Sequence, residues 1–129
     1  ALEFLSYVSK RKSVAFLISD FLTPPFDRAL KVAARRHDLI PIVLQDPFEQ
    51  ALPPLGLIHM TDSESGRRVA APLFSKRYRD RFQAARKSQR LALRELFARC
   101  NIEAIRVDGS QSLVKPVLDY FRLRARRSG

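Results

Sequence analysis

Three aspartates that follow apolar runs are the residues whose type and position could support chemistry. Asp20 follows the apolar run at 14–18 after one residue, Ser19, and Asp46 and Asp108 follow two further apolar runs. The carboxyl ends of parallel strands open onto the crevice where open α/β sheets bind ligands, and a carboxylate there suits Mg²⁺. One hypothesis is therefore a Mg²⁺-dependent phosphohydrolase centred on Asp20, with Asp46 or Asp108 as a second ligand. The alternative is that Asp20 only fixes the turn into the next helix through local hydrogen bonds.

The remaining polar motifs are better explained by structure than by catalysis. Asp46 to Glu49 (DPFE) could supply two carboxylates for acid–base work, but the segment also fits a helix cap followed by Pro at the first helical position. His37 and His59 have no metal-ligand spacing, Cys100 is the single cysteine, and there is no Gly-rich phosphate loop. The sequence therefore predicts a protein that is not an enzyme and that needs no cofactor.

An excess of basic residues is the strongest departure of the composition. There are 24 Lys and Arg residues against 13 Asp and Glu residues, and the formal net charge of +11 favours an acidic partner. The bases are concentrated in two predicted helices, 75–99 and 112–127. The side chains that we expect to bind a partner are Lys76, Arg77, Arg79, Arg86, Lys87 and Arg90. An acidic protein surface is favoured because no positioned stacking or base-reading groups are evident, and nucleic-acid binding by the two helices is the alternative.

The elements that must position these side chains alternate between strands and helices. Continuous apolar runs at 13–19, 39–44 and 102–107 are typical of strands buried on both faces of a parallel sheet. A polar stretch with Gly66, between two short runs, predicts a β-hairpin. The predicted helices are 1–9, 23–37, 75–99 and 112–127. Thr23, followed by Pro24, is the expected cap of the second helix, and Ser112 is that of the last. In the third helix, Phe82, Leu96 and Phe97 lie on one apolar stripe.

The alternation of strands and helices predicts an α/β protein. We expect a partial doubly wound, Rossmann-like sheet of short parallel strands with flanking helices and one inserted β-hairpin, in a single domain over residues 1–129. Pro41 lacks the N–H that a central strand requires, so it should lie where no neighbouring strand needs that donor. No apolar run approaches the roughly 20 residues of a membrane span, so we expect a soluble, cytoplasmic protein. The absence of an initial Met suggests a piece of a longer polypeptide.

Five segments of the sequence carry a resemblance to a known family. They are ISDF at 18–21, RRHD at 35–38, DPFEQALP at 46–53, GLIHMTDSESG at 56–66 and LDYFRLRARR at 118–127. The chain thereby resembles the bacterial proteins of domain of unknown function 58 (DUF58). This resemblance implies a von Willebrand factor A-like fold, of which the chain would be the C-terminal half. It also implies a non-enzymatic role as the partner of a MoxR-type AAA+ ATPase.

The same resemblance implies where a metal would bind. Von Willebrand A domains combine an Asp-x-Ser-x-Ser loop with an Asp that ends a later strand, and Ser19-Asp20 matches that last element. The first strand and its loop would lie before Ala1, so the site here is incomplete and Mg²⁺ is expected only in a full-length protein. Asp108 to Ser112 also read Asp-x-Ser-x-Ser, but in the family this strand lies two strands from Asp20, roughly 9 to 10 Å away. A helix cap and turn is therefore favoured for Asp108.

The sequence also bears on self-association. If earlier strands of the sheet are absent, the strand at 14–18 forms an apolar edge, and such edges invite pairing with another chain. The sequence therefore predicts a homodimer through the edge of strand 14–18.

Overall fold

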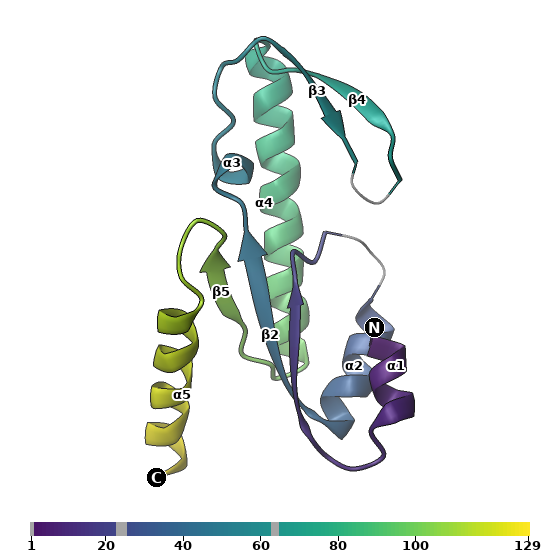
Figure 1. The fold of residues 1–129 in the computed structure, drawn as a ribbon, viewed down its shortest axis with the longest axis vertical. Coiled ribbons are helices and arrows are strands. Elements are labelled where there is room, and N and C mark those ends of the chain that lie inside the picture. The colour runs from purple at the N-terminus through teal and green to yellow at the C-terminus, as the bar shows by residue number, and fades with distance from the viewer. Residues whose placement is uncertain (1, 23–25, 63–64) are drawn as a thin grey trace. The chain divides into compact units, whose positions relative to one another are not determined.

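Two compact units make up the computed structural model of the chain, which describes residues 2–22, 26–62 and 65–129. The first unit contains the residues up to Asp46 together with Leu91–Gly129, and the second contains Pro47–Arg90. Figure 1 labels the helices and strands of both units, except β1, with numbers in chain order. A single domain over residues 1–129 stays a prediction.

A three-stranded parallel sheet forms the centre of the first unit. Its strands are β1 (Val14–Ser19), β2 (Asp38–Gln45) and β5 (Ile105–Asp108), and β2 lies between the other two (Figure 1). Phe16 of β1 pairs with Ile40 of β2, and Ile42 of β2 pairs with Ile105 of β5. The predicted apolar runs therefore become neighbouring parallel strands.

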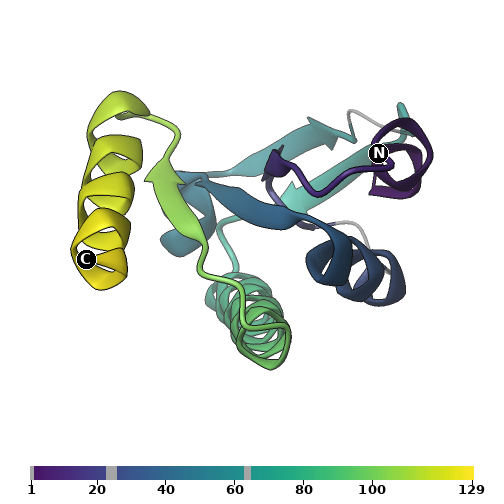
Figure 2. The same cartoon turned by 90° about the horizontal axis from the view of Figure 1, so that it is seen from below.

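Helices pack against both faces of this sheet. They are α1 (Leu2–Val8), α2 (Asp27–Arg36), the end of α4 (Lys76–Arg99) and α5 (Val114–Ser128). The cluster on one face joins α2, β2 and α4 and is partly covered by α1; its buried members are Leu30, Ala33, Leu39, Val43, Leu96 and Phe97. The cluster on the other face joins β2 and β5 to α5, through Ile40, Ile42, Ile105, Val107, Val117 and Tyr120. Figure 2 shows α5 on the opposite side of the unit from α1 and α2.

Pro41 lies inside the central strand and is buried. The Asp38 N–H donates to the Ser13 carbonyl at 2.9 Å, so the even-numbered residues of β2 direct their backbone groups toward β1. Pro41 therefore faces the β5 side, where pairing begins only at Ile42. The missing N–H falls where no strand needs it, which confirms the sequence prediction.

The second unit contains an antiparallel hairpin of β3 (Leu57–Thr61) and β4 (Arg68–Pro72), preceded by the short helix α3 (Pro47–Gln50). Gly66 lies in the hairpin connection with φ of +68°, a left-handed conformation that glycine adopts without strain. Its N–H donates to the Asp62 carbonyl at 2.8 Å. The predicted hairpin is confirmed, and so is the α/β class with a parallel sheet and flanking helices.

The buried part of α4 is shorter than its apolar stripe. Of the predicted stripe, Leu96 and Phe97 are buried, whereas Phe82 is only half-buried. A stripe is buried only where another element covers it, and the first cluster reaches α4 at its carboxyl end.

Two predicted helix caps have different outcomes. Ser112 is not the cap of α5, because Leu113 occupies that position, and the Ser112 Oγ instead accepts the Val114 N–H at 3.3 Å. This short turn leads the chain into the helix. The cap predicted at Thr23 and Pro24 lies outside the described residues, and α2 begins at Asp27.

Candidate functional site

A cluster of exposed cations on the first part of α4 is the main candidate for a binding surface. We name it the basic face and define it by the exposed side chains of Lys76, Arg77, Arg81, Lys87 and Arg90, all in the second unit. At about 100° per residue these positions cover about half of the helix circumference. Asp80 is the single acidic residue between 76 and 90. The helix therefore presents a broad positive surface that is suited to an acidic partner.

Two of the six predicted partner-binding residues make side-chain contacts within the chain, and their role in binding stays a prediction. The Arg79 Nη1 donates to the Leu73 carbonyl at 2.6 Å, and the Arg79 side chain is half-buried. The Arg86 guanidinium lies 5.1 Å from the centre of the Phe82 ring and donates to Gln89 Oε1 at 3.2 Å. Arg79 and Arg86 are three residues before and four after Phe82, on the side of the helix that bears the apolar stripe. That spacing is the signal by which the sequence could have separated them from the basic face.

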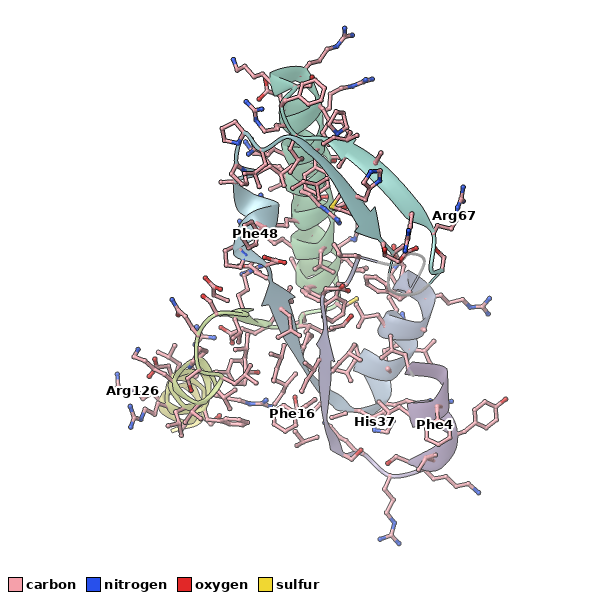
Figure 3. The ribbon with its side chains drawn as sticks, turned by 45° about the horizontal axis from the view of Figure 1, so that its top comes forward. Phe4, Phe16, His37, Phe48, Arg67 and Arg126 are labelled. Carbon is pink, nitrogen blue, oxygen red and sulfur yellow. The ribbon has the colours of Figure 1, made fainter. Side chains whose placement is uncertain are left out.

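The bases of α5 are largely paired within the chain. Asp119 binds Lys115 at 2.9 Å and lies 3.8 Å from Arg122, and the hydrogen bond from Lys115 lowers the pKa of Asp119. Arg127 binds Glu103 at 2.9 Å. Arg126, by contrast, projects away from the sheet (Figure 3). These ion pairs reduce the positive charge that α5 offers to an outside ligand.

The predicted ligand Asp20 lies just beyond the carboxyl end of β1 and is exposed. Its Oδ1 accepts the Leu22 N–H at 3.2 Å, and the neighbouring Ser19 Oγ accepts the Phe21 N–H at 3.0 Å. Phe21 itself has a positive φ of 54°. The local hydrogen bonds expected of a turn are therefore present at Asp20.

Asp108 ends β5 and holds a turn of its own. Its Oδ1 accepts both the Ser110 N–H at 2.9 Å and the Ser110 hydroxyl at 2.8 Å. These two hydrogen bonds, the backbone one first, lower the pKa of the Asp108 carboxyl. The Asp-x-Ser-x-Ser segment thus folds as the turn that the sequence analysis favours.

The described carboxylates are not grouped as a metal site requires. Within residues 2–22, 26–62 and 65–129, no group of three or more His, Cys, Asp or Glu side chains is placed to hold an ion. β2 separates the strands that carry Asp20 and Asp108, and two strand spacings amount to roughly 9 to 10 Å. Asp46 precedes α3, whose first residue is Pro47, as the predicted cap requires, and the Glu49 side chain lies outside the described residues. Among these described residues no set of three ligands is gathered for Mg²⁺, and Asp20 as a ligand stays a prediction.

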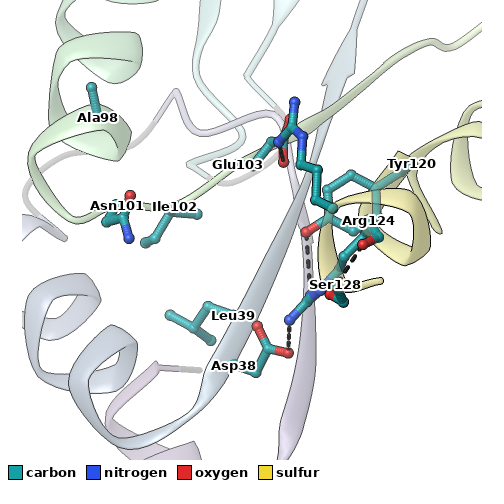
Figure 4. A pocket seen from close by; sticks show the side chains of 10 residues that line it. Asp38, Leu39, Ala98, Asn101, Ile102, Glu103, Tyr120, Arg124 and Ser128 are labelled. Carbon is teal, nitrogen blue, oxygen red and sulfur yellow. Dashed lines mark hydrogen bonds and ion pairs between the residues drawn. The ribbon is translucent and has the colours of Figure 1, made fainter. Parts of the chain in front are cut away.

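A polar cavity of about 570 Å³ lies in the first unit between β2, the end of α4 and α5. Arg124 spans it: one of its η nitrogens binds Asp38, and the other donates to the Tyr120 hydroxyl at 3.4 Å (Figure 4). The hydrogen bond to Asp38 raises the pKa of Arg124. The second charged pair in its lining is Arg127 with Glu103. The charges of these two Arg–carboxylate pairs cancel, so the lining of the cavity has no net charge that would attract an ion.

His37 is buried at the end of α2, and its Nδ1 lies 3.1 Å from the Ser13 Oγ. Its Nε2 is buried without a hydrogen-bond partner in the described part of the chain. The side chain connects α2 to the segment before β1. Its position agrees with the absence of metal-ligand spacing in the sequence.

Among residues 2–22, 26–62 and 65–129, no helix is both long and apolar enough to cross a bilayer.

Comparison with known proteins relates the chain to mycobacterial relatives. A protein of Mycobacterium bovis and one of Mycobacterium tuberculosis, both described as uncharacterized, are 37% identical over 67 residues, which cover 51% of this chain and 21% of each relative. An uncharacterized protein of Mycobacterium avium is 25% identical over 127 residues, covering 98% of this chain and 75% of that protein. The matched part of the chain thus spans about a fifth of the length of the first two relatives. No solved structure gives a significant match.

The family comparison corrects the extent of the resemblance. The family described as protein of unknown function DUF58 matches residues 1–92. The match therefore covers the N-terminal part of the chain and stops before β5 and α5, and the LDYFRLRARR segment at 118–127 lies outside the matched residues. Since the matched region exceeds half of the sequence, the chain belongs to the DUF58 family.

Proposed function

We propose that this chain is a non-enzymatic interaction module that binds an acidic protein surface through its basic face. The observation that supports this proposal most directly is the exposure of Lys76, Arg77, Arg81, Lys87 and Arg90 on one helix with Asp80 as the only acid among them. Cations displayed in this way attract a surface of opposite potential and accelerate association with it.

The partner that we propose is a MoxR-type AAA+ ATPase. Membership of the DUF58 family supports this choice, because the family resemblance implies a von Willebrand A-like partner of such an ATPase. A parallel sheet with helices packed on both faces is compatible with a von Willebrand A-like domain, of which we propose that this chain is the later part. The basic face would be the element that selects the ATPase by charge.

A protein partner is preferred over nucleic acid because the two predicted basic helices are not equivalent. On α5, Lys115, Arg122, Arg124 and Arg127 each have an acidic partner within the chain. A nucleic-acid surface built from both helices would need these cations to contact phosphates. The basic face of α4 alone is a smaller surface, and a complementary acidic patch on a protein suits it.

The test is binding of the chain to a purified MoxR-type ATPase by isothermal titration calorimetry. We expect the variant Lys87→Glu/Arg90→Glu to bind roughly tenfold or more weakly, because it places like charges at the contact. The matched control is Lys10→Glu/Arg11→Glu, which reverses two exposed bases of the first unit and lowers the net charge equally. It should bind within about threefold of the unmodified chain, since charges outside an interface are largely screened.

Equal weakening by both double variants would mean that net charge and not the basic face drives binding, which contradicts the proposal. A parallel titration with a DNA duplex separates the nucleic-acid alternative. Duplex binding that depends on Lys87 and Arg90 and falls steeply with salt, with no binding to the ATPase, would replace the proposal by that alternative.

A further inference from the structure

Three exposed apolar side chains lie where the hairpin of the second unit joins α4. Leu55, Leu57 and Phe74 are 47%, 56% and 68% exposed, and we name this group the apolar corner. All three flank one hydrogen bond, in which the Leu73 N–H donates to the Gly56 carbonyl at 3.2 Å. Figure 1 shows this end of β3 and β4 beside the first turns of α4. The second unit therefore gathers three bulky apolar groups at one exposed surface.

At the end near α4, the two faces of the hairpin differ in burial. Ile58 and Ala71 are opposite one another in the ladder and share the inner face, where Ala71 is fully buried and Ile58 is half-buried. Leu57 and Pro72 form the neighbouring pair, so their side chains point to the other, outer face. Phe74 follows Pro72 in the turn that leads into α4. Clustered apolar groups that a chain leaves exposed in this way mark an interaction surface.

The surroundings of the apolar corner are positively charged. Lys76 and Arg77 begin α4 and are exposed members of the basic face. Arg68 is exposed on the outer face of the hairpin, on which Leu57 also lies. The sequence has no Asp or Glu in residues 50–61 or 65–79. A partner that covers the corner is therefore complementary if it places carboxylates next to apolar side chains.

The backbone at the corner is poorly suited to pairing with an added strand. Because the Leu73 N–H donates to the Gly56 carbonyl, the even-numbered residues of β4 direct their backbone groups away from β3. Pro72 is one of these residues and has no N–H to offer at that edge. β3 begins only at Leu57, so its own edge ends at the corner as well. A helix satisfies its backbone internally and needs only side-chain contacts.

We propose that the apolar corner and the adjoining part of the basic face bind an acidic amphipathic helix of the partner protein. Such a helix presents apolar side chains at positions i, i+3 or i+4 and i+7 and can carry Glu and Asp beside them. The apolar contacts supply affinity, and the bordering cations select an acidic helix over a basic one. This inference extends the proposed function and rests on it for the protein that supplies the helix.

Isothermal titration calorimetry with the purified MoxR-type ATPase tests the contribution of the corner. The variant Leu57→Ser/Phe74→Ser should bind roughly tenfold or more weakly, because it removes two apolar anchors and leaves every charge in place. The matched control is Val114→Ser/Leu123→Ser, which changes two side chains of the first unit that are 63% and 51% exposed. It should bind within about threefold of the unmodified chain. Circular dichroism checks that both variants stay folded.

These variants separate the inference from the proposed function. Binding that is weakened by Lys87→Glu/Arg90→Glu but not by Leu57→Ser/Phe74→Ser leaves the proposed function standing and overturns the inference. Equal weakening by the control pair overturns it too, because exposed apolar groups in general would then be responsible. So does self-association that depends on Leu57 and Phe74, seen by sedimentation equilibrium, because a second copy would then occupy the corner.

Two synthetic acidic helices test the surface without the ATPase. They differ only in carrying Leu or Ala at the positions i, i+3 and i+7 of one face, and fluorescence anisotropy reports their binding to the 129-residue chain. The Leu helix should bind roughly tenfold or more tightly than the Ala helix, and Leu57→Ser/Phe74→Ser should abolish that preference. A preference for Leu without binding to the ATPase supports the corner and refutes the proposed partner. Equal binding of both helices overturns the inference whether or not the ATPase binds.

Discussion

Arg79 and Lys87 carry the same charge on the same helix, but their surroundings give them different roles. Arg79 is half-buried and donates to the Leu73 carbonyl, whereas Lys87 is exposed. A hydrogen bond from a charged donor stabilises the fold by roughly 1.5–3 kcal/mol when it is well formed and shielded, and by less when the group is partly exposed. Charge count alone does not separate the two residues, but their angular distance from the apolar stripe does.

The turn at Asp108 allows a pKa prediction for a single carboxyl group. The pKa of the Asp108 carboxyl lies below the ordinary 3.8 because the carboxylate accepts hydrogen bonds from the Ser110 N–H and hydroxyl. We expect Ser110→Ala to raise this pKa but to leave it below the ordinary value, because the backbone N–H remains and is the larger cause. Carboxyl carbon shifts measured by NMR as a function of pH test this.

The sign of the pH dependence follows from the direction of the shift. A carboxyl whose pKa is lower in the folded state than in the unfolded state stabilises the fold above the unfolded pKa. That contribution is lost as the pH falls below 3.8 and through the folded pKa. Asp108→Asn should flatten this part of the stability curve, and an unchanged curve in that variant would contradict the assignment.

The helix α4 combines a buried end with an exposed beginning. Phe97 is 3% exposed and its ring lies 5.4 Å from that of Phe21, whereas Leu91 of the same helix is 47% exposed. We expect Phe97→Ala to lower the free energy of unfolding by about 3–5 kcal/mol, because it leaves a cavity in the first cluster. Leu91→Ala should change it by no more than about 0.5 kcal/mol. Urea unfolding followed by circular dichroism compares them, and similar losses in both variants would contradict the described burial.

The elements themselves could largely be predicted from the sequence. Strands buried on both faces leave continuous apolar runs, and the hairpin is marked by polar residues around Gly66, so both signals are local. The burial of a helix face is not local, because it depends on which element covers it. Phe82 and Phe97 lie on one stripe, but only Phe97 meets the first cluster.

The candidate site was less predictable for the same reason. Arg124 and Asp38 are 86 residues apart, and only the packing of α5 beside β2 brings them together. The sequence offered the cations of α5 only as part of the nucleic-acid alternative, and the structure shows most of them in ion pairs. The turns at Asp20 and Asp108 were predictable because each hydrogen bond joins residues two positions apart.

At the scale of the whole molecule, the strands of the two units differ in how many of their residues are buried. β2 runs through the first unit with Ile40 and Ile42 buried between two clusters, while the hairpin of the second unit has exposed residues along both strands. An isolated two-stranded hairpin is marginally stable, and local opening follows low burial. We expect the amides of Ile40 and Ile42 to exchange at least about a hundredfold more slowly than those of the hairpin. Hydrogen exchange read by NMR tests this, and equal rates would indicate that the units open together.

Pro41 also bears on where the β2–β5 pairing ends and the polar cavity begins. Because β2 offers no donor at that position, the ladder with β5 stops at the Ile42–Ile105 pair, and residues 102–104 run outside any strand. The polar cavity lies at this point, lined from one side by Asp38 and Leu39 and from the other by the segment that has left the sheet. The position of Pro41 therefore coincides with the end of the pairing between β2 and β5. An alanine in its place would let the two strands close further and narrow the space that Arg124 now spans.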